Sequence, residues 1–236
     1  MIVSPVVLVV GWAFTGVVAA TLTGCAMRRG EQPALPWRTQ AQVLTTAALF
    51  AALAWRLGPR AVLLAPSWLA ATGVALAAID LRTRRLPNRL VLPSYLAIPS
   101  LAALAGTHPS ALVRATLGMA AVLTFYALLY TVPGHLGGGD LKIAGPIGFL
   151  LAWQSWSALL TGTLLTWLLA ALALPLSTTA PSRTAAPSLP LGPFIIGATL
   201  ATTLLLPWDP SDLGGVLFPG WLGARGAFVA TFAGSW

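Results

Sequence analysis

The chain has 236 residues, of which 57% are hydrophobic and only 8% are Asp, Glu, Lys or Arg. Soluble domains carry about 25% of such charged residues, so this composition excludes a soluble globular enzyme and a disordered chain. The single cysteine, Cys25, excludes an intrachain disulfide and a zinc site built on paired cysteines. A polytopic membrane protein remains.

Long apolar runs predict an all-α membrane bundle of about eight transmembrane helices. In chain order, the predicted spans lie near 3–25, 41–56, 61–79, 90–107, 111–131, 141–153, 155–175 and 191–207. These runs are continuously apolar, whereas the strands of a membrane barrel alternate polar and apolar residues. Residues 213–236 are apolar but interrupted by Gly and Pro, so the sequence leaves open whether they cross the membrane.

The first apolar run invites a second interpretation, because residues 22–25 (Leu-Thr-Gly-Cys) have the form of a lipoprotein cleavage box. A signal peptide carries its positive charge before the apolar run. Here Arg28 and Arg29 come after it, and residues 1–5 have no charged side chain. We therefore expect a retained first helix whose N-terminus lies outside the cell.

The basic residues predict the orientation of the bundle. The side that contains residues 26–40 receives Arg28, Arg29, Arg38, Arg82, Arg84, Arg85, Arg89, Lys142 and Arg183, whereas the opposite side receives Arg56, Arg60 and Arg114. The excess of positive charge marks the first side as cytoplasmic. Little of the chain lies in water, so we expect the net charge of +8 to face anionic lipid headgroups rather than nucleic acid.

Two of the five acidic residues form a candidate site. Asp80 closes the third apolar run, and Asp140 follows the run Gly137, Gly138 and Gly139. Two predicted spans separate these acids, and an even number of crossings returns the chain to the same face. Both carboxylates are therefore predicted at the cytoplasmic membrane boundary, where such groups mark function more often than structure. A structural role stays open for each alone: Asp80 as a partner of the arginines that follow it, and Asp140 as a helix cap.

Two neighbouring Asp side chains can hydrolyse a peptide bond without a metal or a nucleophilic side chain. Like charges in a low-dielectric site do not both ionise easily, so the pair shares a proton and its apparent pKa values split apart. The ionised partner takes a proton from water, and the protonated partner polarises the scissile carbonyl. The sequence has no G-x-S-x-G, H-E-x-x-H or P-loop motif that would favour another chemistry.

Three motifs resemble those of the type IV prepilin peptidases. Ile79–Asp80 with the downstream Leu86-Pro87-Asn88 resembles their first aspartate motif, residues 137–142 resemble their G-x-G-D motif, and residues 190–194 resemble their Pro-x-Gly-Pro segment. The motifs stand in the family's order over residues 77–195. The resemblance implies a GxGD-type membrane aspartic endopeptidase that removes the leader of type IV prepilins or pseudopilins at the cytoplasmic face of the bacterial inner membrane.

The resemblance also implies roles for particular residues. Asp80 and Asp140 would be the catalytic pair, with Gly137, Gly138 and Gly139 as the motif loop. The candidates for supporting the pair or for lining the substrate route are Asn88, Lys142, Pro190, Gly192 and Pro193. No metal or other cofactor is implied, and the expected partners are a prepilin or pseudopilin helix and membrane lipids, with no nucleic acid.

The chain departs from the longer members of that family, which insert a methylating cytoplasmic domain with paired CxxC motifs after the first helix. Residues 1–40 hold only the first helix and a short loop, and the paired cysteines are absent. We therefore predict one membrane-embedded peptidase domain over residues 1–236.

Two other function classes stay open. A multi-pass transporter places its ionisable residues near the bilayer midplane, whereas Asp80 and Asp140 are predicted at span ends. A non-catalytic assembly subunit of a pilus or secretion machine would tolerate the loss of either acid.

Overall fold

The computed structural model describes residues 5–27, 36–84, 86–131, 137–177 and 191–208. Within these residues the chain forms α-helices and a single 3-10 turn, and no strand. The elements are α1 (Pro5–Met27), α2 (Pro36–Leu57), η2 (Ala61–Leu63), α3 (Leu64–Thr83), α4 (Asn88–Leu104), α5 (Pro109–Tyr130), α6 (Gly138–Gln154), α7 (Trp156–Ser177) and α8 (Gly192–Leu205). Each predicted span coincides with one of these α-helices, which confirms the all-α class. The question of residues 213–236 lies outside the described residues.

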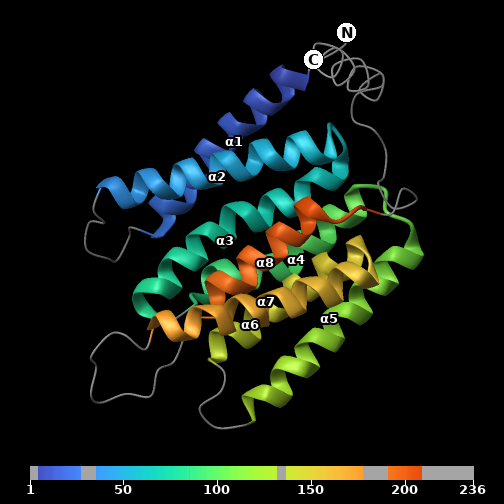
Figure 1. Ribbon diagram of the computed structural model, residues 1–236. Coiled ribbons are helices and arrows are strands. Elements are labelled where there is room, and N and C mark those ends of the chain that lie inside the picture. Colours follow the sequence, from blue (N-terminus) through green and yellow to red (C-terminus); the bar gives the residue numbers. More distant parts are fainter. Residues whose placement is uncertain (1–4, 28–35, 85, 132–136, 178–190, 209–236) are drawn as a thin grey trace, which may run out of the picture.

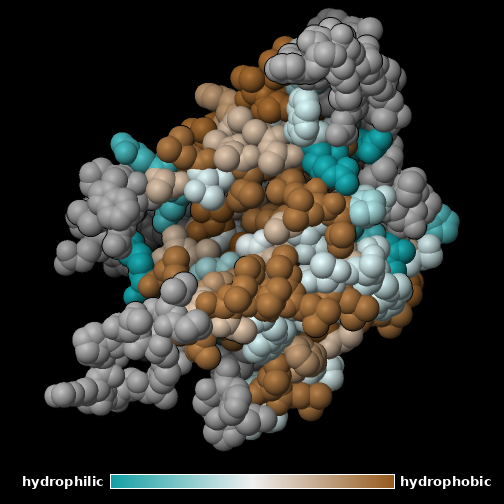
Figure 2. Space-filling view, viewed as in Figure 1, coloured by the Kyte–Doolittle hydropathy of each residue, from teal (hydrophilic) through white to brown (hydrophobic). Residues whose placement is uncertain are grey.

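Four segments have the length and hydropathy of a membrane span: Pro5–Gly24, Ala61–Thr83, Pro109–Tyr130 and Trp156–Leu174. Figure 2 shows hydrophobic residues across the middle of the molecule and hydrophilic residues towards two opposite ends. This distribution is that of a membrane helical bundle. The remaining helices are more polar or shorter. The 14 residues of α8 reach about 21 Å, less than a hydrocarbon core of about 30 Å.

Four helices form the centre of the bundle. Helix α3 packs on α4 and α8, and α6 packs on the same two helices. In Figure 1 the α1–α2 pair lies at one edge of the molecule and α5 at the other. Helices α3 and α6, which carry the two acids, therefore stand on opposite sides of a four-helix ring.

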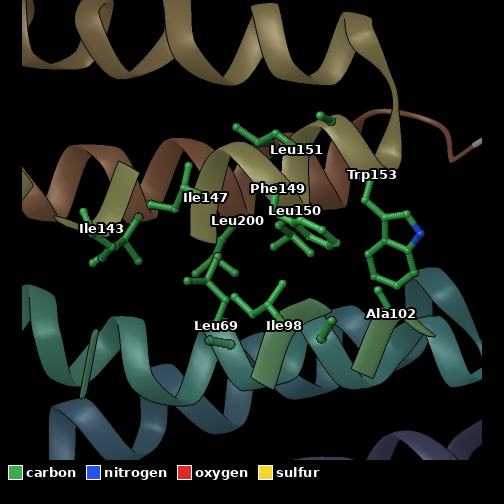
Figure 3. Packing of buried hydrophobic residues seen from close by; sticks show 14 of the residues in the cluster. Leu69, Ile98, Ala102, Ile143, Ile147, Phe149, Leu150, Leu151, Trp153 and Leu200 are labelled. Carbon is green, nitrogen blue, oxygen red and sulfur yellow. The ribbon is translucent and has the colours of Figure 1, made fainter. Parts of the chain in front are cut away.

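Apolar side chains fill this ring. Figure 3 shows Leu69 of α3 and Ile98 of α4 facing Ile147 and Leu150 of α6, with Leu200 of α8 beside them. All five side chains are buried. Because α3 and α6 are apolar on every face, burial inside a bundle is the expected place for both helices.

Arginine side chains close two of the central helices at the end opposite the acids. Arg114 of α5 donates from Nε to the carbonyl of Ala152 at 2.7 Å and from a terminal nitrogen to that of Trp153 at 2.6 Å. Arg56 of α2 donates to the carbonyl of Leu204 at 2.9 Å. The last carbonyls of a helix have no partner within it and carry partial negative charge. These arginines therefore satisfy the C-termini of α6 and α8.

Candidate active site

Asp80 lies in the last turn of α3. The helix ends where Arg84 takes a left-handed conformation (φ 52°), and the Arg84 N–H donates to the Asp80 carbonyl at 2.9 Å. The Asp80 side chain is only 5% exposed. Its Oδ2 accepts a 3.1 Å hydrogen bond from the backbone N–H of Gly192, the first residue of α8. The main chain of Asp80 thus accepts the hydrogen bond that ends α3, and its side chain accepts one from the first residue of α8.

Gly192 makes this contact possible because it has no Cβ. A Cβ at position 192 would lie 2.6 Å from Oδ2 of Asp80 and 3.0 Å from its Cγ. Any other residue would therefore force the carboxyl group away. Sequence reasoning placed Gly192 among the residues of the substrate route, and the structure brings it into direct contact with a predicted catalytic acid.

Asp140 lies in the first turn of α6, with a side chain 7% exposed. Its carboxyl group accepts a hydrogen bond from the backbone of Gly137, the N-cap residue of the helix. A side chain at the third helical position that reaches back to the N-cap N–H is half of a capping box. The helix-cap role of Asp140 is therefore present, and it orients the carboxyl group.

The structure brings the two predicted acids together. Their carboxyl groups are close enough for the charge of Asp80 to act on Asp140. Both groups are removed from water, so holding two negative charges there at once is unfavourable. Each carboxyl also meets backbone N–H at the N-terminus of a helix, Asp140 in its own helix and Asp80 in α8. That environment accommodates one negative charge and one proton shared by the pair.

The three motif glycines are not equivalent. A Cβ on Gly139 would lie 3.1 Å from Cβ of Leu86, and one on Gly137 would lie 3.1 Å from Oδ2 of Asp140. A Cβ on Gly138 would meet only the Tyr130 ring, at an ordinary 3.9 Å. The first and third glycines therefore lie in close contacts, and the middle position has room for a side chain.

We expect Gly139→Ala to lower the stability of the protein by about 1–3 kcal/mol, because the added methyl overpacks the buried Leu86. Gly138→Ala is the matched control, and it should be neutral or slightly stabilising since Ala favours a helix. Thermal unfolding in detergent measures both variants. The double variant Gly139→Ala/Leu86→Ala removes two of the three close contacts, those with Cγ at 3.1 Å and Cδ1 at 3.2 Å, and leaves the one with Cβ. A loss of stability no smaller than the sum of the single losses would contradict this account.

The other predicted supporting residues fall into two groups. Lys142 Nζ donates to Oδ1 of Asn88 at 3.0 Å, so these two residues link α6 to α4 at the edge of the site. Pro193 lies in the first turn of α8 and is half-buried. Pro190 lies outside the described residues.

Tyr126 of α5 is a site neighbour that sequence reasoning missed. It is 3% exposed, within electrostatic reach of Asp140, and its ring lies 6.2 Å from that of Trp167 of α7. No motif marks it, because it belongs to a long apolar run. Its buried neighbours Gly118 and Val122 precede it at four-residue spacing on the face that packs on α6. That spacing is the signal that could have identified it.

Within the described residues, no three His, Cys, Asp or Glu side chains gather into a group that could hold a metal ion. The acid pair is accompanied by backbone N–H groups, by Arg84 and by aromatic and aliphatic side chains.

Fold and site together define an integral membrane helical bundle that holds a buried pair of interacting acids. The sequence model of the type IV leader peptidase family matches residues 63–176, which include Asp80, the motif glycines and Asp140. Over these residues, which make up slightly less than half of the chain, the sequence is similar to the type IV leader peptidase family. No curated protein and no solved structure matches the chain.

Proposed function

We propose that this protein is an aspartic endopeptidase of the GxGD type that removes the leader peptide of type IV prepilins or pseudopilins. The observation that carries the proposal is that two buried carboxyl groups, Asp80 and Asp140, lie within electrostatic reach of each other, although their helices stand on opposite sides of the central ring. The match to the leader peptidase family over residues 63–176 supports the substrate class.

The surroundings of the two acids suggest different roles. Burial favours the protonated form of both acids. At Asp80 the Gly192 N–H and the positive charge of Arg84 oppose this effect and favour the ionised form. Asp140 faces the negative charge of Asp80, which favours its protonated form. We therefore assign Asp80 as the general base and Asp140 as the general acid.

In the proposed reaction, Asp80 takes a proton from water as the water oxygen bonds to the scissile carbonyl carbon. Asp140 gives its proton to the carbonyl oxygen, which forms a neutral tetrahedral intermediate. The intermediate then collapses: the C–N bond breaks, the proton on Asp80 passes to the leaving nitrogen, and Asp140 recovers its own proton. Motif glycines without side chains allow an extended substrate backbone to approach.

We further propose that residues 1–236 form one peptidase domain in the bacterial inner membrane, with the N-terminus outside and the acids facing the cytoplasm. Arg82 in the last turn of α3 and Arg84 at its C-cap follow Asp80 closely in the chain. Their charges favour contact with anionic headgroups on the cytoplasmic side. The prepilin helix would lie in the membrane alongside the bundle, and the proposed reaction uses no cofactor.

Inverted membrane vesicles that carry this chain test the proposal directly. We expect them to cleave an added prepilin once, before its hydrophobic helix, as shown by mass spectrometry of both fragments. Cleavage should persist in a metal chelator, and sealed right-side-out vesicles should cleave poorly because the site faces inward. Vesicles without the chain are the control. An intact substrate in both vesicle types would favour the transporter or the assembly subunit instead.

A further inference from the structure

Helix α6 contains a proline, Pro146, two turns after Asp140. A proline has no backbone N–H, so the carbonyl four residues earlier loses its partner within the helix. In α6 that carbonyl belongs to Lys142. A carbonyl without a partner is costly inside a membrane protein, where water does not replace the missing hydrogen bond.

The Lys142 carbonyl is satisfied from another helix. The hydroxyl of Tyr95 in α4 donates to it at 2.7 Å. The Tyr95 ring reaches this position across Gly145, where a Cβ would lie 2.5 Å from the hydroxyl oxygen and 2.6 Å from a ring carbon. Pro146 thus leaves a carbonyl free to accept the Tyr95 hydroxyl, and Gly145 leaves the space that the Tyr95 ring occupies.

The segment of α6 before Pro146 carries Asp140, and it has little stiffness of its own. It begins with Gly138 and Gly139, which are poor helix formers, and Pro146 removes one of its hydrogen bonds to the rest of the helix. Its orientation therefore depends on contacts with the neighbouring elements. Those on the α4 side are the Tyr95 hydrogen bond, the bond from Lys142 Nζ to Asn88, and the packing of Leu86, just before α4, on Gly139.

We propose that Tyr95 is a positioning residue for Asp140: its hydroxyl replaces the hydrogen bond that Pro146 removes and so directs the first turns of α6 towards Asp80. Tyr95 touches neither acid in this arrangement; it acts through the main chain at Lys142. The inference rests on the proposed function, because its readout is cleavage by the acid pair.

Tyr95→Phe removes the donor and keeps the ring in the space that Gly145 leaves. We expect kcat for prepilin cleavage to fall about tenfold, the order of effect of losing one hydrogen bond, with KM changed less than twofold. A substrate-binding residue would raise KM instead, and a purely structural residue would lower the amount of folded protein. Tyr130→Phe is the matched control, since Tyr130 is half-exposed and its ring lies near Gly138.

Pro146→Ala supplies the missing N–H and makes the Tyr95 hydroxyl unnecessary. In this background we expect Tyr95→Phe to lower kcat less than twofold. Pro146→Gly supplies the same N–H and replaces Pro146→Ala in the experiment if that variant does not accumulate.

An unchanged kcat in Tyr95→Phe alone, or an equal fall in kcat in both backgrounds, would overturn the inference. If the wild type cleaves no prepilin, it is the proposed function that fails; if the wild type cleaves and Tyr95→Phe cleaves as fast, only the role of Tyr95 fails.

Discussion

Replacing either Asp80 or Asp140 by Asn is expected to lower prepilin cleavage about 1,000-fold or more, while the protein still accumulates in the membrane. The amide keeps the shape of the carboxyl group and its oxygen still accepts the backbone N–H of Gly192 or Gly137. It neither takes a proton from water nor donates one to a carbonyl oxygen, and general acid–base catalysis contributes about 10²- to 10⁴-fold. Each substitution also ends the repulsion between two buried acids, so thermal unfolding should occur at an unchanged or higher temperature.

The combination of lost activity and retained stability distinguishes a catalytic pair from a structural one. A carboxyl group needed only for packing would lower stability and activity together when it is replaced. Asp212→Asn is the matched control. Asp212 lies outside the described residues and follows the eighth predicted span, so with the N-terminus outside the cell the predicted topology places it on the side opposite the acid pair. Its replacement should leave cleavage unchanged. Substantial cleavage by either Asp80→Asn or Asp140→Asn would contradict the paired-acid mechanism.

The sequence was sufficient for the elements and for the meeting of the acids. Continuous apolar runs mark the helices because lipid allows a spanning segment few alternatives. The count of spans between Asp80 and Asp140 is even, so both acids come to one end of the bundle, and in the structure they lie within electrostatic reach of each other. Neither step requires knowing which helices are neighbours.

The neighbours of the acids could not be predicted in the same way. Contacts such as Gly192 with Asp80 and Tyr95 with the Lys142 carbonyl depend on how each helix is rotated about its axis. The rotation of a helix about its axis is normally predicted from the apolar stripe that faces the core. Helices that are apolar on every face have no such stripe. Pro146 does predict that the carbonyl of residue 142 lacks its usual partner within the helix. Only the fold shows that a side chain of α4 donates the replacement hydrogen bond.

Gly192→Ala is expected to lower kcat for cleavage about 100-fold. The new methyl would lie 2.6 Å from Oδ2 of Asp80, and both the carboxyl group and the N-terminus of α8 are buried, so one of them must move. A displacement of about 1 Å in a catalytic group can cost about 100-fold in rate. The variant keeps the backbone N–H, so it tests the close approach itself. Single-turnover cleavage with saturating enzyme measures the loss without interference from product release.

Gly197→Ala is the matched control, because it lies in the same helix at an exposed position with open space around its Cα. Both substitutions raise the helix propensity of α8 by a similar amount, so a difference between them reports the contact with Asp80. We expect Gly197→Ala to cleave at the wild-type rate with equal or higher thermal stability. Equal rates for the two variants would mean that Asp80 works without its close contact with α8. Of the two groups that favour the ionised form of Asp80, the Gly192 N–H and Arg84, only Arg84 would then matter.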